Sequence, residues 1–321
     1  MSILKNQRVL ITGGTGTFGH GIVEYLLDTD VKAIIILSRD ELKQFNMSQK
    51  FKNHIYYKKL HFFLGDIRDK DRISLALYNV DIVFHAAALK RIDSIEYNPT
   101  EAIKTNIIGT QNLIEEAIKN KVKYFMSIST DKAVNPYNLY GGTKFCLEKL
   151  TIAANNLSGG YTKFSVSRYG NVMSSRGSVV HIFKHQIDNN KEITITDRNM
   201  TRFNITLNKA IEFVIDNINN MYGGEIFVPK LKSYKIMDIA NIFSNKYKII
   251  GLRDGEKLHE EMISICEARN TIIHNNKFII LTKLHHIDLF EIYKEYELFN
   301  KDSYNSLNNE YLTIDEIKQL L

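Results

Sequence analysis

The sequence TGGTGTFG at residues 12–19 is the clearest indication of the fold. A short apolar run precedes it at residues 9–11 and an amphipathic segment follows at residues 18–27, which predicts a strand, a turn and a helix. Its three spaced glycines permit, in order, a tight turn, close approach of the backbone to a pyrophosphate, and close packing of the helix on the strand. A plain glycine-rich turn has the same composition, but the strand and helix around it favour a dinucleotide site.

Around this turn, the first half of the chain alternates short apolar runs with amphipathic stretches. The runs predict strands at residues 9–11, 33–37, 61–64, 82–86, 124–128 and 164–169. The amphipathic stretches predict helices at residues 18–27, 72–77, 100–119 and 139–155. Asp40 or Ser38 can cap a further helical segment that starts at Glu41. This alternation predicts an α/β fold with a doubly wound parallel sheet of Rossmann type.

The pattern changes after Tyr169. Residues 170–177 are rich in Gly, Asn and Ser and predict a loop. Shorter, mixed segments follow at residues 179–187, 192–195, 208–219, 225–228, 236–243 and 248–250. We expect residues 1–170 to form a nucleotide-binding domain. We expect residues 171–321 to form mainly a smaller, mixed α/β substrate-binding region, partly interwoven with the sheet.

Composition excludes several classes of protein. The chain has 321 residues, 44% apolar and 24% charged, with a net charge of +6, which is typical of a globular protein. Two distant cysteines, Cys146 and Cys266, indicate a reducing compartment and argue against a metal site. Basic residues never run longer than a pair, which argues against nucleic acid as a partner. No apolar run has the length of a signal peptide core or a membrane span, so we expect a soluble, cytoplasmic protein.

The end of the second predicted strand bears on the cofactor. An NAD site usually has an acidic residue here, to bind the ribose 2′-hydroxyl. Ser38 and Arg39 stand here instead, and Arg39 can pair with a 2′-phosphate, with Lys43 adding charge. A surface arginine is the plainer interpretation, and the nearby Asp40 and Glu41 keep NAD open. We predict NADP.

Tyr140 and Lys144 are four residues apart, so on a helix they share one face. An ammonium beside a phenol is expected to lower the pKa of the phenol. Tyr140 can then take a hydroxyl proton while hydride leaves the same carbon for a nicotinamide, and Lys144 can hold the nicotinamide ribose. This spacing is common by chance, but with the glycine turn it is typical of short-chain dehydrogenase/reductase proteins. The chain resembles their extended, sugar-nucleotide-modifying branch over essentially its whole length.

Residues 129–133, STDKA, resemble a particular group within this branch. Simple epimerases are expected to have a small hydroxyl residue here and no acid–base pair. The pair Asp131 and Lys132 resembles the soluble, C5-inverting UDP-N-acetylglucosamine 4,6-dehydratases, whereas glucose 4,6-dehydratases have Asp-Glu. A salt bridge at a strand end is the plainer interpretation. The resemblance extends to residues 38–44, 86–90, 96–99, 104–106, 168–172, 175–179, 200–203 and 255–260.

This resemblance implies a mechanism on UDP-N-acetylglucosamine. Tyr140 takes the 4-hydroxyl proton while C4 hydride goes to NADP. Lys132 removes the C5 proton, and Asp131, next to Thr130, protonates the departing 6-hydroxyl. Hydride then returns to C6, and a proton added to the opposite face inverts C5. The product is UDP-2-acetamido-2,6-dideoxy-β-L-arabino-hex-4-ulose.

The resemblance also implies binding residues and a homo-oligomer, either a dimer or a hexamer. The expected cofactor contacts are Gly13, Thr15, Gly16, Thr17, Phe18, Gly19, Ser38, Arg39, Lys43, Asp66, Ile67, Ala86, Ala87, Ala88, Asn106, Tyr140, Lys144 and Tyr169. The expected sugar-nucleotide contacts are Lys90, Asn171, Val179, Arg202, Arg253 and Glu256. No metal is implied.

Two other functions stay open: a UDP-hexosamine 4-epimerase that uses only the Tyr-Lys pair, and a non-catalytic NADP-binding regulator. The sequence departs from the dehydratase pattern near the sugar pocket. The departures are Arg91-Ile92-Asp93 for His-Val-Pro, Gly142 for Ala, Ser174 for Gly, His181 and Asp254 for Pro, and Asn204 for Trp. They bear on the exact sugar and on product stereochemistry.

Overall fold

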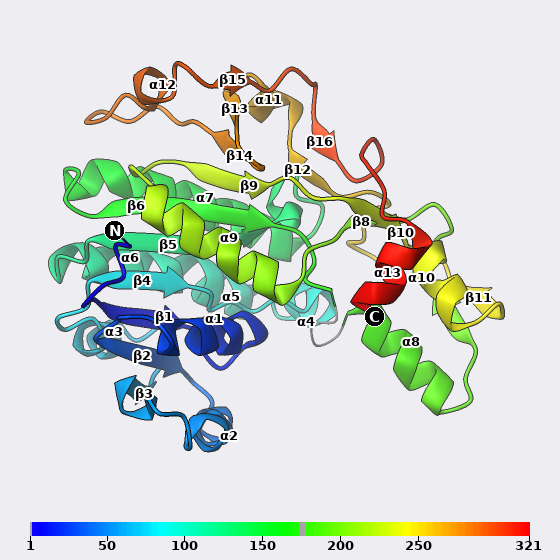
Figure 1. The fold of residues 1–321 in the computed structure, drawn as a ribbon, viewed down its shortest axis with the longest axis horizontal. Coiled ribbons are helices and arrows are strands. Elements are labelled where there is room, and N and C mark those ends of the chain that lie inside the picture. Colours follow the sequence, from blue (N-terminus) through cyan, green and yellow to red (C-terminus); the bar gives the residue numbers. More distant parts are fainter. Residues whose placement is uncertain (1, 174–177) are drawn as a thin grey trace.

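A ten-stranded sheet runs through the molecule, with helices on both of its faces (Figure 1). The computed structural model describes residues 2–173 and 178–321, so Ser174 and part of the 175–179 stretch lie outside the described residues. From one edge, the strands are β3 (Leu60–Leu64), β2 (Ala33–Ser38), β1 (Arg8–Thr12), β4 (Ile82–His85), β5 (Tyr124–Thr130), β6 (Lys163–Tyr169), β9 (Ile226–Pro229), β14 (Lys277–Ile280), β13 (Thr271–His274) and β15 (Glu297–Leu298).

The strands from β3 to β9 in this order run parallel, and β14, β13 and β15 follow antiparallel. The predicted α/β fold with a doubly wound parallel sheet is confirmed. Since parallel strands end at one edge of a sheet, the carboxyl ends of β1, β2, β4, β5 and β6 lie along the same edge, where ligands of such folds bind. The sites predicted after these strands therefore face one region.

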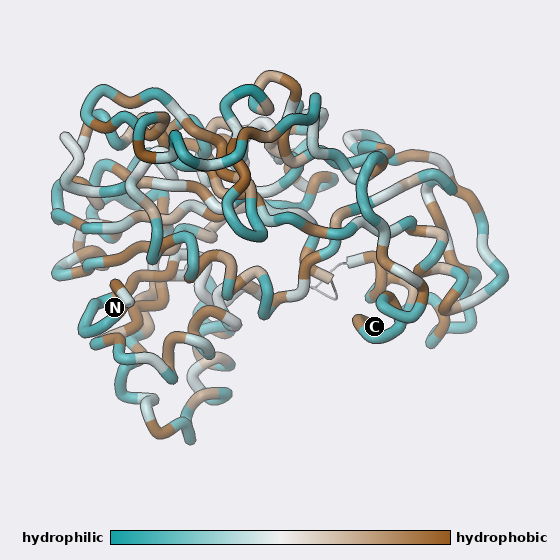
Figure 2. Tube along the Cα trace, turned by 45° about the horizontal axis from the view of Figure 1, so that its top comes forward, coloured by the Kyte–Doolittle hydropathy of each residue, from teal (hydrophilic) through white to brown (hydrophobic). Residues whose placement is uncertain are grey.

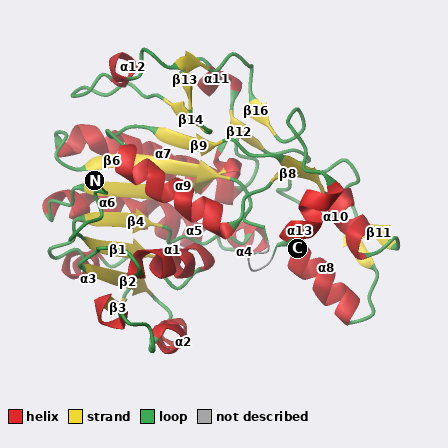
Figure 3. Ribbon diagram, viewed as in Figure 1, coloured by secondary structure: helices red, strands yellow, loops and turns green. Residues whose placement is uncertain are grey.

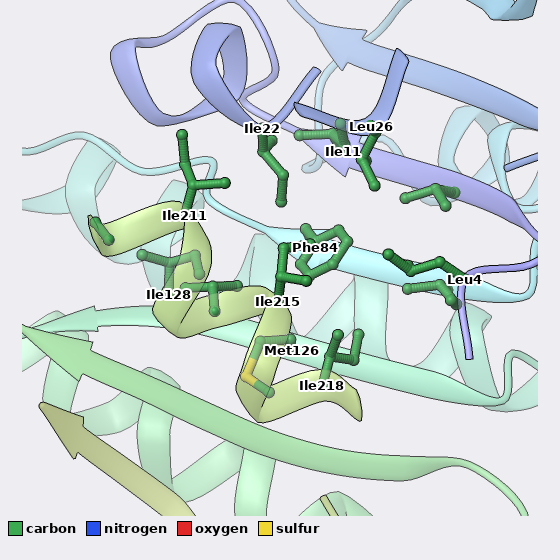
Figure 4. Packing of buried hydrophobic residues seen from close by; sticks show 14 of the residues in the cluster. Leu4, Ile11, Ile22, Leu26, Phe84, Met126, Ile128, Ile211, Ile215 and Ile218 are labelled. Carbon is green, nitrogen blue, oxygen red and sulfur yellow. The ribbon is translucent and has the colours of Figure 1, made fainter. Parts of the chain in front are cut away.

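Each face of the sheet carries its own helices and hydrophobic core. One face is covered by α1 (Thr17–Leu27), α2 (Glu41–Phe51) and α9 (Leu207–Asn220), the other by α3 (Lys70–Ala76), α6 (Gly109–Lys119) and α7 (Leu139–Ser158). Figure 4 shows isoleucines of α9 directed toward Phe84 and Met126 of the sheet and toward Ile22 of α1. Apolar segments lie along the central strands in Figure 2, and the outer loops are largely hydrophilic.

A smaller lobe lies beyond the carboxyl ends of the parallel strands, at the right in Figures 1 and 3. Most of its elements share a separate core that includes Phe183, Ile195 and Ile239. These elements are α8 (Val179–Asp188), α10 (Ile236–Phe243), α13 (Ile314–Leu320), β7 (Ile193–Ile195), β10 (Ser233–Lys235) and β11 (Tyr247–Ile249). The strand β8 (Thr201–Phe203) joins the lobe by pairing with β10. Further short elements are η1 (Tyr57–Lys59), α4 (Ile92–Tyr97), η3 (Asp131–Ala133), β12 (Glu261–Ile263), α11 (Ile265–Ala268), α12 (Leu289–Ile292) and β16 (Tyr304–Asn305).

The predicted helix at residues 100–119 is interrupted. It consists of α5 (Pro99–Ala102), a π-helical segment η2 (Ile103–Ile108) and then α6. Within η2, Asn106 uses its side-chain amide to hold both the N–H and the C=O of Leu89, at 2.8 Å each. The regular helix is predicted from the periodicity of its apolar residues. That periodicity carries no information about a tertiary contact such as this one.

The hairpin of β13 and β14 is absent from the predicted elements. Its two apolar runs are joined by Asn275 and Asn276, and Asn275 has a φ of 54°. Asparagine tolerates this left-handed conformation, so the stretch TIIHNNKFII carries a hairpin signal. Through this hairpin and β9, chain segments beyond residue 170 extend the central sheet.

Candidate active site

The turn between β1 and α1 is shaped by close backbone approaches. Gly13 has a φ of +65°, and a Cβ there would lie 2.8 Å from the backbone of Ala87. A Cβ on Gly19 would lie 2.2 Å from the carbonyl oxygen of Gly14. Gly16 begins α1 without a side-chain cap, so the first-turn N–H groups are not taken by a capping side chain. This geometry fits the phosphates of a dinucleotide.

On the expected adenosine side of this site, the basic side chains form ion pairs with acidic residues of the protein. Nη1 of Arg39, whose side chain is 47% exposed, lies 3.4 Å from Oδ2 of Asp66. Nζ of Lys43 lies 2.8 Å from Oδ2 of Asp40, the residue that also caps α2 by accepting from the Lys43 N–H. The predicted cap at Asp40 is confirmed. Both predicted cations have carboxylate partners within the protein.

Buried polar side chains hold the loop after β4 in place. His85 is fully buried, with its ring nitrogens 2.7 Å from Oγ1 of Thr12 and 2.9 Å from Oγ1 of Thr110. Burial lowers the pKa of His85 to about 3, so this ring is neutral. Because Asn106 is fully buried and bonded to Leu89, it shapes the loop of Ala86 to Ala88 rather than presenting an open polar face.

Tyr140 and Lys144 lie on the first turns of α7, as predicted. Lys144 is buried and donates from Nζ to the carbonyl oxygen of Ile128 at 2.6 Å, and burial lowers its pKa to about 8. Burial also raises the pKa of Tyr140 to about 12, against the opposing charge of Lys132. The expectation that Lys144 lowers the pKa of Tyr140 is therefore wrong for this structure, because burial dominates and the lysine is directed at a carbonyl.

Asp131 and Lys132 lie in η3, directly after β5. Nζ of Lys132 lies 3.1 Å from Oδ1 of Asp131, which also accepts a 2.8 Å hydrogen bond from Oγ1 of Thr130. The side chain of Asp131 is fully buried and that of Lys132 is 17% exposed. A Cβ on Gly141 would lie 2.2 Å from the carbonyl oxygen of Lys132, so this glycine lets α7 pack directly against η3.

A second buried carboxylate completes this cluster. Oε1 of Glu260, whose side chain is 2% exposed, lies 3.0 Å from Nζ of Lys132 and 3.6 Å from Nε of Arg202. Nζ of Lys132 also donates to Oδ1 of Asn171 at 3.0 Å. Sequence analysis missed Glu260 as a site residue, although it ends the 255–260 stretch of the resemblance. No local spacing links it to Lys132, which is 128 positions away.

The charges in this cluster shift one another. Burial raises the pKa of Asp131, and Glu260 raises it further, while Lys132 opposes the shift. Burial opposes charge on Lys132, but Asp131 and Glu260 outweigh it, so the pKa of Lys132 is raised. Burial disfavours charge on Glu260, but Lys132 and Arg202 hold the pKa of Glu260 below its usual range. The resting cluster is therefore an ion-paired set with a protonated lysine.

A cavity of about 190 Å³ adjoins the cluster. Its lining includes five of the predicted sugar-nucleotide residues, which are Asn171, Val179, Arg202, Arg253 and Glu256. Lys90 is not part of the lining. The guanidinium of Arg202 donates to the backbone carbonyls of Thr201, Lys257 and Leu258, so it is occupied by the protein's own backbone. Asn171, which lines the cavity, also accepts a hydrogen bond from Lys132, so the cavity adjoins the charged cluster there.

Within residues 2–173 and 178–321, no cluster of three or more His, Cys, Asp or Glu is arranged to hold a metal ion. In the same part of the chain, no helix combines the length and apolar character needed to cross a membrane.

The fold, the glycine turn and the Tyr-Lys pair on α7 together define an extended short-chain dehydrogenase/reductase. The chain matches the family described as "Polysaccharide biosynthesis protein" over residues 9–282, and it belongs to that family. The resemblance to this class is confirmed.

Three similar proteins are informative. A Campylobacter jejuni protein named UDP-N-acetylglucosamine 4,6-dehydratase (inverting) is 48% identical, over 89% of this chain and 86% of the relative. A Rickettsia canadensis protein named UDP-glucose 4-epimerase is 39% identical, over 98% of this chain and 95% of the relative. The X-ray structure of Pen from Bacillus thuringiensis has a TM-score of 0.90 and 36% identity, covering 99% of this chain and 97% of that one.

Proposed function

We propose that the protein is an inverting UDP-N-acetylglucosamine 4,6-dehydratase. The observation that carries the proposal is the ion pair of the buried Asp131 with the largely buried Lys132, which supplies an acid and a base near Tyr140, the residue predicted to take the 4-hydroxyl proton. An oxidation at C4 needs only a group that takes the 4-hydroxyl proton, whereas elimination across C5–C6 needs both an acid and a base. The 48% identity to a relative with this name supports the same reading.

The cofactor we propose is NADP, held by the residues expected from the sequence. When bound, it accepts hydride from C4 and returns it to C6. The uncapped start of α1 and the glycine turn fit its pyrophosphate, and Arg39 stands at the strand end where a 2′-phosphate would lie. Lys144 and Tyr140 would hold the nicotinamide ribose.

The acid and base need no net change in proton count. Lys132 can act as a base only when neutral, and Asp131 can act as an acid only when protonated. Moving one proton from Nζ of Lys132 to Oδ1 of Asp131, 3.1 Å away, produces both forms at once. Lys132 then takes the C5 proton, and Asp131 protonates the departing 6-hydroxyl. The raised pKa of Asp131 favours its protonated form.

NMR of the product from UDP-N-acetylglucosamine in deuterium oxide tests this function. We expect a 6-deoxy-4-keto sugar with inverted C5 and solvent deuterium at C5, because the original C5 proton is lost to the exchangeable Lys132 ammonium and a different, solvent-exchanged proton is added to the opposite face. The hydrogen that moves from C4 to C6 should remain protium. A 6-deoxy product with unchanged C5 configuration would refute the inverting assignment alone.

A second candidate is a UDP-hexosamine 4-epimerase, favoured by the 39% identity to the Rickettsia relative. In the same NMR experiment, it would give a product inverted only at C4 that keeps its 6-hydroxyl. A non-catalytic NADP-binding regulator would leave the substrate unchanged. Assembly into a dimer or hexamer and a cytoplasmic location stay predictions.

A further inference from the structure

We infer that Glu260 is a positioning residue that holds the Lys132 ammonium against Asp131; the inference rests on the proposed dehydratase function. Consecutive residues of a helical turn point in different directions, so adjacency alone does not bring Lys132 to the Asp131 carboxylate. Glu260 approaches from another part of the chain, with Oε1 3.0 Å from Nζ.

The Lys132 ammonium is held at three points. It has three N–H groups, and three acceptors lie around it: Oδ1 of Asp131 at 3.1 Å, Oε1 of Glu260 at 3.0 Å and Oδ1 of Asn171 at 3.0 Å. Glu260 is the only carboxylate of the three that comes from outside η3. Without Glu260, one N–H of the Lys132 ammonium loses its acceptor, and the ammonium loses one opposing charge.

The backbone of Glu260 is itself held in place by hydrogen bonds. Its backbone N–H donates to Oγ of Ser306 at 2.9 Å, and the backbone N–H of Ser306 donates to the Glu260 carbonyl at 2.8 Å. Ser306 is buried and lies 2.7 Å, Oγ to Oγ1, from Thr201. The carboxylate that faces Lys132 is therefore carried by a double hydrogen bond to the C-terminal segment.

A comparison with Glu148 separates positioning from a plain structural ion pair. Glu148 is equally buried, and both its oxygens accept from Arg168, at 2.9 Å from Nε and 2.6 Å from Nη2. In contrast, Oε2 of Glu260 and Oδ2 of Asp131 are buried without a hydrogen-bond partner among the described residues. Leaving such an oxygen unpaired costs stability, so the arrangement calls for a reason other than stability.

The charge of Glu260 raises the pKa values of both Asp131 and Lys132. Removing the negative charge of Glu260 makes protonation less favourable at both Asp131 and Lys132. Other ionisable groups also face the cluster and would remain in place. They are Arg202 on β8, Tyr234 on β10, Lys257 in the loop before β12, and Tyr140 on α7.

The test compares Glu260→Gln with Glu261→Gln in the full-length enzyme. Glu261 is the next residue, and its carboxylate accepts from Asn135, not from Lys132. We measure reduced-cofactor absorbance in a single turnover with UDP-N-acetylglucosamine, 6-deoxy product by NMR, and the pH profile of product formation. In Glu260→Gln, we expect reduced cofactor to form within threefold of the wild-type rate. Elimination should slow at least tenfold, and both limbs of the pH profile should move to lower pH.

Glu261→Gln should leave all three measurements unchanged. Glu260→Asp, which keeps the charge but withdraws it by one methylene, should slow elimination without moving the pH profile, and it serves if Glu260→Gln fails to fold. Wild-type elimination in both Glu260 variants would overturn the inference while the function stands. The inference would also be overturned if Glu260→Gln slowed oxidation and elimination equally and left the pH profile of product formation unmoved. A wild-type enzyme without 6-deoxy product would overturn the proposed function and this inference together.

Discussion

The cofactor side and the sugar side of the site are built in different ways. At the turn between β1 and α1, the backbone itself makes the surface, and Gly13 and Gly19 lie where a Cβ would strike other backbone atoms. Beside the cavity, the site is built from side-chain charges: Lys132 lies within hydrogen-bond distance of both Asp131 and Glu260. In the proposed function, the first side would bind the cofactor through its shape and N–H groups, and the second would act by transferring protons.

The two sides should therefore be sensitive to different kinds of substitution. Adding a methyl group should damage the cofactor side, because there is no room for it. Removing a charge should damage the sugar side, because each charge compensates another.

Lys132→Ala should lower product formation by about 10²–10⁴-fold, the usual contribution of an acid–base group. Because Tyr140 is untouched, the sugar should still be oxidised, and single-turnover absorbance should show reduced cofactor accumulating. Tyr140→Phe is the matched variant, and it should give neither reduced cofactor nor product. Full turnover by Lys132→Ala would mean that another residue is the base. Thermal unfolding of both variants checks that the fold is retained.

Gly13→Ala should lower the free energy of unfolding by about 2–4 kcal/mol and abolish cofactor binding, since it combines left-handed strain with a backbone clash. Gly159→Ala is the control. Gly159 also has a positive φ, +59°, but a Cβ there meets nothing within 4 Å. It should cost only about 1–2 kcal/mol and leave cofactor binding unchanged. Urea unfolding and cofactor titration measure both, and equal effects would contradict the importance of crowding at Gly13.

Arg39→Ala should weaken NADP binding by about 1–3 kcal/mol and leave NAD binding nearly unchanged, because it removes a charge-assisted contact to the 2′-phosphate. Here we expect a charged side chain, and not only the shape of the backbone, to matter on the cofactor side. Calorimetric titration of both cofactors into wild type and variant measures it. Equal affinity of the wild type for NAD and NADP would refute the preference.

Gly142→Ala should raise the free energy of unfolding by about 0.5–1 kcal/mol, because it replaces a glycine inside α7 where a Cβ meets nothing within 4 Å. Gly141→Ala, its neighbour in sequence, should destabilise the protein, since its Cβ would strike the Lys132 carbonyl. Urea unfolding of the two variants gives the comparison. A loss of stability in Gly142→Ala would show that the helix needs this glycine.

The sequence predicts the strand, the glycine turn and the helix of the cofactor side because their signal is local. Glycine spacing, a preceding strand and a following helix lie within twenty residues, and the cap at Asp40 is equally local. The pair Tyr140 and Lys144 is a helical spacing of four. The direction of the Tyr140 pKa shift was not predictable, because it depends on burial by the rest of the fold.

The sugar side is only partly predictable because it is assembled from distant segments. Asp131 and Lys132 are visible as a motif, but Glu260 reaches them from 128 positions away. The guanidinium of Arg202 is predicted as a ligand contact, yet its neighbours' carbonyls occupy it. Periodicity also misses the π-helical segment η2, in which the Asn106 side chain bonds across to Leu89.

The placement of Asp131 and Lys132 within the single turn η3 has an evolutionary consequence. The two groups that would turn an oxidation into an elimination are encoded by adjacent codons, while Tyr140 lies on another element. Changes at two neighbouring codons would remove the elimination and leave the machinery of oxidation intact. A gene of this kind therefore lies a very short mutational distance from a simpler activity on the same scaffold.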